Sequence, residues 1–70
     1  MVRQPVTSSV LKSVGYDSGT STLELEFEDR AVYRYFDFPE FLHRGLMLSS
    51  SKGQFLNSRI VGRFRHERVT

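Results

Sequence analysis

The chain has 70 residues, no cysteine and a formal net charge of +2. This length allows one small domain, and without cysteine neither disulfides nor thiolate metal sites can stabilise it. Six Phe and three Tyr supply much of the apolar area for a core. We expect one cytoplasmic domain over residues 1–70, with its core in residues 8–64 and residues 1–7 as a loose arm.

The charges are divided unequally along the chain. Residues 1–40 carry four basic and seven acidic residues, whereas residues 41–70 carry six basic residues and one acidic residue. Such asymmetry indicates an anionic partner, although the two halves could instead attract each other in the fold. No signal-peptide pattern and no apolar stretch near the ~20 residues of a membrane span is present, so we expect no membrane partner.

The first predicted strand is Val10–Tyr16, which is rich in β-branched and aromatic residues. Its apolar positions Leu11 and Val14 are three residues apart rather than two. This spacing predicts a β-bulge, with Gly15 as the expected position because glycine tolerates irregular backbone.

Two further strands are predicted at Leu23–Glu28, where apolar and acidic residues alternate, and at Val32–Phe36. We expect a three-residue loop, Asp29–Ala31, because an odd loop length keeps both strands' apolar residues on one side of the sheet. That loop pairs Glu28 with Val32 and sets Glu26 opposite Arg34, a mildly favourable pair of opposite charges.

Two short helices should follow the strands. Asp37 and Glu40 form a predicted capping box for the first helix, which ends near Leu48 and buries a stripe at helical spacing. Ser51 caps the second helix and Gln54 answers it. The predicted buried stripe of the first helix is Phe38, Phe41, Leu42 and Leu46, and Gly45 on the same stripe would allow close approach to the sheet. The expected core contacts of the second helix are Phe55, Leu56 and Ile60.

The expected fold is therefore α+β, a three-stranded antiparallel β-meander packed against two short C-terminal helices. Residues Val61 to Val69 are a candidate final strand, with Phe64 facing inward. Arg63, Arg65 and Arg68 would then face water.

The order and spacing of several short motifs resemble the KTSC domain. This module is named for its occurrence at the C-terminus of some lysyl-tRNA synthetases and also forms small bacterial and phage proteins. Arg30 and Ser49 depart from the family pattern, which has Gly and Ala there. The resemblance implies a small module without an assigned activity, for which the synthetase context suggests RNA binding. The matching residues are Val14 to Asp17, Leu23, Leu25, Phe27, Tyr33-Arg34-Tyr35, Pro39, Ser51, Gly53, Phe55, Asn57 and Ile60.

The first candidate site is the start of the second helix, Ser51-Lys52-Gly53. Backbone N–H groups at a helix start attract an anion, Lys52 adds positive charge, and Gly53 allows close approach. The alternative is a capping loop in which Ser51 bonds the Gln54 amide, and the two interpretations are compatible.

A second candidate site is a basic surface that would contact phosphates in a salt-sensitive way. Tyr33 and Tyr35 would be either a stacking platform for bases or core residues, and the strand parity favours the core. Asn57 would contact a ligand or, as we favour, fix a loop backbone. The basic residues are Arg59, Arg63 and Arg65, with Arg44, Lys52 and Arg68 as further members, and the alternative is a solvated surface.

Catalysis and metal binding are not expected. His43 and His66 are the only histidines, they fall on distant elements, and no cysteine accompanies them. No nucleophile elbow is present. We expect a non-catalytic module without cofactor or metal that binds RNA or another polyanion, and the alternative is a protein-interaction module or a phage or bacterial accessory protein.

Overall fold

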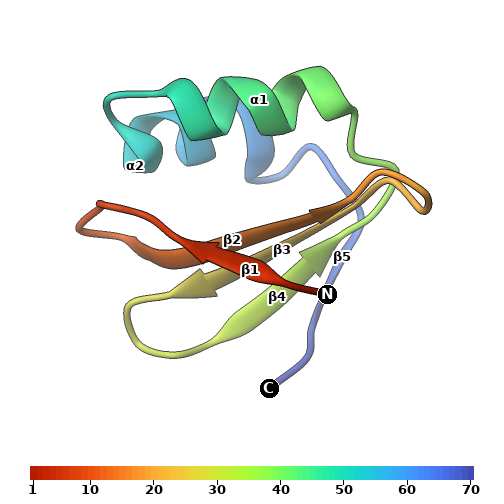
Figure 1. Cartoon of the computed structure of the whole chain (residues 1–70), viewed down its shortest axis with the longest axis horizontal. Helices are drawn as coiled ribbons and strands as arrows, with labels where there is room; N and C mark the ends of the chain where they lie inside the picture. The colour runs from red at the N-terminus through yellow and green to blue at the C-terminus, as the bar shows by residue number, and fades with distance from the viewer.

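The computed structural model describes all residues from 1 to 70 and has two layers, an antiparallel β-sheet and a helical layer on one of its faces (Figure 1). The five strands follow one another across the sheet in the order β1-β2-β3-β4-β5. The helices are inserted in the chain between β4 and β5. The elements are β1 Arg3–Pro5, β2 Leu11–Asp17, β3 Thr22–Phe27, β4 Val32–Tyr35, α1 Glu40–Leu48, α2 Lys52–Phe55, the π-helical turn η1 Leu56–Ile60 and β5 His66–Arg68.

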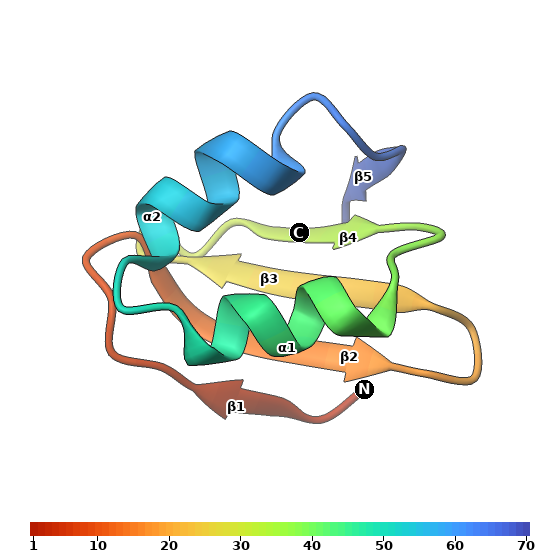
Figure 2. The same ribbon diagram turned by 90° about the horizontal axis from the view of Figure 1, so that it is seen from above.

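The prediction of an α+β fold with two short helices is confirmed, but the sheet is larger than expected. Residues 1–7 are not simply a loose arm, because Arg3–Pro5 pairs with β2 in antiparallel register. The candidate final strand is confirmed only over His66–Arg68, which pairs with β4. Viewed from above, β5 lies beyond β4 at the edge of the sheet, whereas α1 lies over β2 and β3 (Figure 2).

The β3–β4 hairpin has the predicted parity but a different register. Leu25 pairs with Tyr33 and Glu26 pairs with Val32, a slip of two residues from the predicted pairing. The cause is a three-residue loop that starts one residue earlier, closed by the hydrogen bond from Phe27 N–H to the Ala31 carbonyl at 2.9 Å. Arg30 closes this loop at φ 74°, the left-handed position that such loops require and that glycine fills most easily.

The predicted bulge in β2 exists but lies elsewhere. The register shifts between Leu11 and Ser13, so Lys12 is the extra residue, and Gly15 pairs regularly with Glu24. The bulge turns both Leu11 and Val14 toward the helical layer. Gly15 is needed for a different reason, because a Cβ there would lie 3.0 Å from the backbone oxygen of Val2.

Helix α1 begins three residues after the predicted cap. Asp37 has φ 54°, which is incompatible with the extended backbone of an N-cap residue, and Pro39 occupies the cap without a side-chain hydrogen bond. Phe38 is fully buried. Phe41 contradicts the predicted buried stripe, since 69% of its surface is exposed.

Helix α2 confirms its predicted cap, because the Ser51 hydroxyl accepts a hydrogen bond from Gln54 N–H at 3.4 Å. The small size of Gly45 serves the contact between helices rather than the sheet, since a Cβ there would lie 3.1 Å from the Phe55 ring. No helix is long and apolar enough to cross a membrane.

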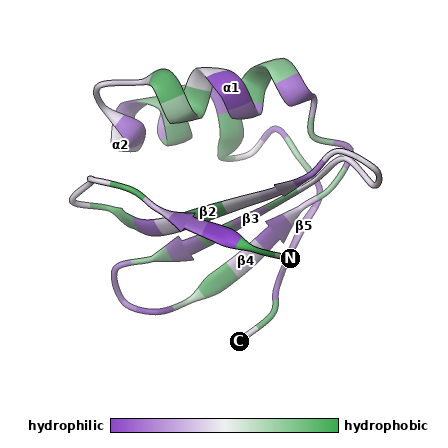
Figure 3. Cartoon of the chain, viewed as in Figure 1, coloured by the Kyte–Doolittle hydropathy of each residue, from purple (hydrophilic) through white to green (hydrophobic).

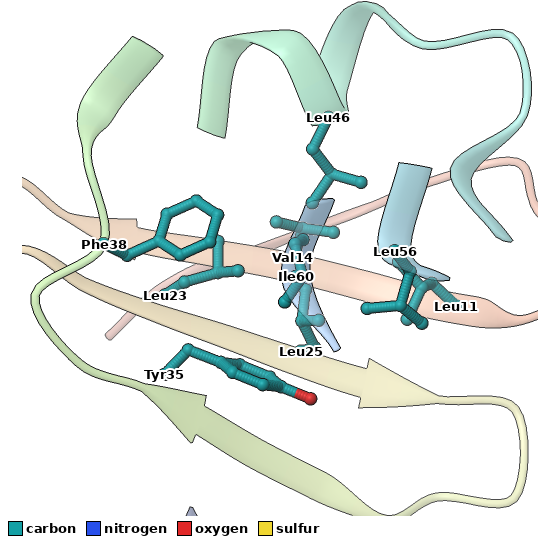
Figure 4. Close-up of a cluster of buried hydrophobic side chains, with 9 residues drawn as sticks. All are labelled: Leu11, Val14, Leu23, Leu25, Tyr35, Phe38, Leu46, Leu56 and Ile60. Carbon is teal, nitrogen blue, oxygen red and sulfur yellow. The ribbon is translucent and has the colours of Figure 1, made fainter. Parts of the chain in front are cut away.

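One hydrophobic core lies between the sheet and the helices, and Figure 4 shows its side chains pointing toward one another. Phe64 packs inward as predicted, with its ring centroid 4.7 Å from that of Phe38. Strands β2 and β3 alternate between hydrophobic and hydrophilic residues, whereas β1 and β5 are mainly hydrophilic (Figure 3). The core residues are Leu11, Val14, Leu23, Leu25, Tyr35, Phe38, Leu46, Leu56 and Ile60.

Candidate functional site

The open face of the sheet carries a charge network that the structure satisfies internally. Glu24 lies at its centre and accepts hydrogen bonds from Arg3 at 2.7 Å and from Arg34 at 2.8 Å. Glu26 accepts a further bond from the hydroxyl of Ser13 at 2.8 Å. Burial raises the pKa of Glu24, but the hydrogen bonds and charges of Arg34 and Arg3 outweigh it and leave the pKa below its ordinary value. These arginines therefore stabilise the sheet.

The basic residues after position 41 form few ion pairs. The one ion pair among them joins Arg44 to Glu40 at 4.0 Å within α1. The acidic first half therefore does not neutralise the basic second half, apart from this adjacent pair. Four arginines from η1 to β5 form no ion pair with an Asp or Glu side chain, and they are Arg59, Arg63, Arg65 and Arg68.

These four arginines, which we call the arginine segment, contact aromatic rings or main-chain oxygens, and Arg68 Nε donates to the main-chain oxygen of Thr70. The guanidinium of Arg59 lies 5.8 Å from the ring centroid of Phe55, and that of Arg65 lies 5.1 Å from the ring centroid of Phe36. Arg63 Nε donates to the Ser58 carbonyl at 3.1 Å. Each guanidinium carries five N–H donors, so every arginine of the segment keeps free donors for an anion.

The arginine segment follows one side of the molecule rather than one flat face. The chain from η1 through β5 runs along the β4 side of the sheet (Figure 2). Arg44 and Lys52 do not belong to it. Arg44 is exposed on α1, and Lys52 Nζ donates to the carbonyl of Ser49 at 3.0 Å and to that of Met47 at 3.4 Å, where it caps the end of α1.

Two side chains of the predicted anion site at Ser51-Lys52-Gly53 are therefore used within the protein. Lys52 is directed to α1, and the Ser51 hydroxyl is bonded by Gln54 N–H. A Cβ on Gly53 would lie 3.1 Å from Val10, so the glycine accommodates a core neighbour on this side. Asn57 is exposed on η1 and its side chain makes no hydrogen bond, so it does not fix a loop backbone.

Tyr33 and Tyr35 do not share one environment. Tyr35 belongs to the core, as the strand parity predicts, whereas Tyr33 is half-buried. Both line an open cleft of about 460 Å³ on the side of the sheet that faces the helices. Phe27 from β3 and Arg68 from β5 line the same cleft.

His66 is the residue of this region that sequence reasoning missed. In β5 it pairs with Tyr35, and its ring centroid lies 5.4 Å from that of Tyr35 and 5.9 Å from that of Tyr33. The predicted strand Val61–Val69 gave no register against β4, and only this register brings His66 and Arg68 to the two tyrosines.

The other histidine is structural. His43 stacks on Tyr16 with ring centroids 4.7 Å apart, and burial lowers its pKa below the ordinary value. No group of three or more His, Asp or Glu side chains could hold a metal ion.

Comparison with known proteins identifies the architecture. The family model of the KTSC domain matches residues 7–64. The structure of a KTSC domain protein from Yersinia pestis superposes with a TM-score of 0.96 at 38% identity, covering 99% of this chain and 97% of that one.

Two kinds of relatives share the sequence. A protein of Tsukamurella paurometabola is 37% identical over 62 residues, which cover 89% of this chain and 92% of that protein. The lysine–tRNA ligase of Nostoc punctiforme is 39% identical over 62 residues, which cover 89% of this chain. The match spans only 11% of that ligase, so the same domain occurs both as nearly a whole small protein and as a small part of a large one.

Proposed function

This chain belongs to the KTSC domain family, and we propose that it is a non-catalytic module that binds RNA or another polyanion through phosphate groups. The arginine segment is the observation that carries the proposal. Its four guanidinium groups form no ion pair with an Asp or Glu side chain, although the chain contains eight such residues. Unpaired arginines on one side of a molecule supply the positive surface that attracts a phosphate backbone.

The way the segment is held suits this role. Aromatic rings and backbone carbonyls orient Arg59, Arg63 and Arg65 without neutralising them. Arginine is well suited to phosphate because its planar donors match two phosphate oxygens at once. A pre-oriented guanidinium also loses less side-chain freedom on binding.

The relatives favour RNA among the polyanions. The curated relatives that carry this domain as a small part are lysine–tRNA ligases, whose name specifies a tRNA substrate. This chain spans about a tenth of their length, so their aminoacylation activity is not part of the proposal. What we propose for this chain is contact with the phosphate backbone.

The test is titration of the protein into a labelled single-stranded RNA, read by fluorescence anisotropy at about 50 and 200 mM salt. Four phosphate contacts predict that the dissociation constant rises about 50-fold between these concentrations. The double variant Arg63→Glu/Arg65→Glu should abolish most of the binding at the lower concentration.

The matched control is Lys12→Glu/Arg44→Glu, which makes the same change in net charge at exposed positions outside the segment. This control should bind within a few-fold of the unmodified protein. The proposal is wrong if no RNA binds at 50 mM salt, or if the control loses as much affinity as the Arg63/Arg65 variant.

A second candidate function is protein interaction through α1. Phe41 and Leu48 are 69% and 84% exposed, and their seven-residue spacing places them on the same side of the helix. Met47, which precedes Leu48 in α1, packs against the core and is not part of this patch. The variant Phe41→Ser/Leu48→Ser separates the functions, since it should leave RNA titration unchanged and should weaken only a protein complex.

A further inference from the structure

The cleft beside the Tyr33-Arg34-Tyr35 motif has an aromatic wall. The rings of Phe27 and Tyr33 meet edge to face at 5.8 Å, and His66 continues the row at 5.9 Å from Tyr33 and 5.4 Å from Tyr35. His66 is exposed and Tyr33 is half-buried, so the row ends at the surface. Unstacked bases stack on rows of solvent-exposed aromatic rings on a sheet.

Two hydroxyl groups in the cleft have no protein partner. The third tyrosine, Tyr16, donates its hydroxyl proton to the Phe38 carbonyl at 2.5 Å, whereas the hydroxyls of Tyr33 and Tyr35 make no hydrogen bond within the protein. No fully buried side-chain polar atom lacks a partner, so these two hydroxyls reach solvent in the cleft. Figure 4 shows the Tyr35 hydroxyl at the end of the ring far from Phe38.

The Tyr35 hydroxyl remains a hydrogen-bond donor at neutral pH. Burial, and then the neighbouring Tyr33, raise the pKa of Tyr35 above its ordinary value of 10.0. The ring is fixed in the core while its polar end is available, which is the arrangement that orients a ligand rather than one that only fills space.

The cleft also carries both signs of charge, from different elements. Arg68 enters it from β5, and Glu28 and Asp29 enter it from the β3–β4 hairpin. A ligand that fits this lining has an anionic group for Arg68, a flat ring for the aromatic wall, and N–H donors for the carboxylates. One nucleotide unit of a single strand has all three when its base carries an exocyclic amino group.

We propose that this cleft holds one unstacked, amino-bearing nucleobase of a single-stranded RNA, with the adjoining phosphate on Arg68. The inference rests on the proposed function, because the arginine segment holds the neighbouring phosphates. Arg65 precedes β5 and Arg68 ends it. In extended chain, three residues place their Cα atoms about 10 Å apart. Their side chains point to opposite sides of the extended chain, since Arg68 lines the cleft and Arg65 lies over Phe36. The RNA strand would therefore pass around the β5 edge of the sheet to reach the rest of the segment.

The experiment compares three single-stranded probes of equal length and phosphate number, an abasic ribose-phosphate strand, oligocytidine and oligouridine. Oligocytidine should bind about tenfold more tightly than the abasic strand, because one base stacks in the cleft. It should also bind several-fold more tightly than oligouridine, whose ring has a carbonyl where cytosine has an amino group.

Two variants test the residues. Tyr33→Leu keeps apolar bulk but removes the aromatic ring, and it should make oligocytidine bind no better than the abasic strand. Glu28→Gln, at an exposed position, should remove the preference for oligocytidine over oligouridine. Arg63→Glu/Arg65→Glu should instead weaken all three probes by the same factor.

A measurement on the unmodified protein covers the case in which Tyr33→Leu does not fold. Cytidine monophosphate titrated into the protein should shift the ring proton signals of Tyr33 and His66 upfield, as a stacked base does. If all three probes bind equally well and these signals do not move, the proposed function stands and the base cleft is refuted. If none of the probes binds, both proposals fall.

Discussion

The sheet and the C-terminal segment use arginine in opposite ways. On the sheet, Arg3 and Arg34 both bond the buried carboxylate of Glu24. From η1 to β5, Arg59 and Arg65 lie over aromatic rings and meet no carboxylate. The overall charge of +2 therefore says little about a partner. The partners of each arginine decide whether its charge is used inside the fold or is available outside it.

Removal of the central carboxylate should have the largest effect on stability. The variant Glu24→Gln keeps the shape of the side chain but leaves two guanidinium groups without their anion. The free energy of unfolding should fall by about 2 kcal/mol, because hydrogen bonds to a buried charge are lost while the arginines keep partial contact with water. Urea denaturation measures the change, and the melting temperature should fall by about 8–16 °C.

The controls for Glu24→Gln are two variants in the C-terminal segment. Glu67→Gln removes an exposed carboxylate that pairs in register with Arg34 but forms no ion pair. Arg63→Gln removes a charge of the arginine segment. Both should change the free energy of unfolding by less than about 0.5 kcal/mol. A loss as large as that of Glu24→Gln would show that the arginine segment stabilises the fold and is not free for a partner.

Acid should weaken the fold in two separate pH ranges. His43 has a pKa lowered from 6.5 by burial, so the unfolded chain takes up its proton first and stability falls as the pH drops below 6.5. Glu24 has a pKa lowered from 4.5, so its contribution is complete above pH 4.5 and is lost as the pH falls toward the folded-state value. Urea midpoints between pH 8 and pH 3 measure both declines. His43→Gln should flatten only the first and Glu24→Gln only the second.

The smallest expected change in stability concerns Arg30, which neither bonds Glu24 nor belongs to the arginine segment. Arg30 is exposed, forms no ion pair, and has φ 74° in the β3–β4 loop. Arg30→Gly should raise the free energy of unfolding by about 1 kcal/mol, because a side chain in the left-handed region costs more than the extra freedom that glycine has when unfolded. Thermal unfolding measures the gain. Arg30→Ala loses the same charge but keeps the strain, so a similar gain in that variant would refute this explanation.

Much of the fold could be predicted from periodicity, but the pairing between elements could not. The alternation in Leu23–Glu28 identifies a strand because one side of it is buried. Parity gives the side on which Tyr35 lies, but the register depends on where the loop begins, and Asp29–Ala31 and the loop one residue earlier keep the same parity. The strand Arg3–Pro5 has no such alternation. An ion pair of Arg3 with Glu24 of β3 stabilises its position, and the sequence pattern does not reveal that contact.

The candidate site was predictable only where it follows from local composition. The arginines after residue 58 are evident in the sequence, whereas the role of Lys52 depends on the carbonyls that α1 leaves unpaired at its end. The base cleft requires the register of β5 on β4, which brings His66 and Arg68 beside Tyr33 from more than thirty residues away in the sequence. Composition alone does not contain that register.

The late position of β5 in the chain has a consequence for folding. Strands β1 to β4 follow one another through short connections, whereas the two helices and η1 separate β5 from β4 in the chain. Pairing β5 with β4 closes this long connection, which costs chain entropy, and β5 buries little surface in return because its three residues are exposed. Short-range pairings form first and weakly buried edges open most easily. Amide protons of β5 should therefore exchange fastest among the strands that pair with β4, so one wall of the cleft can detach while the core stays folded.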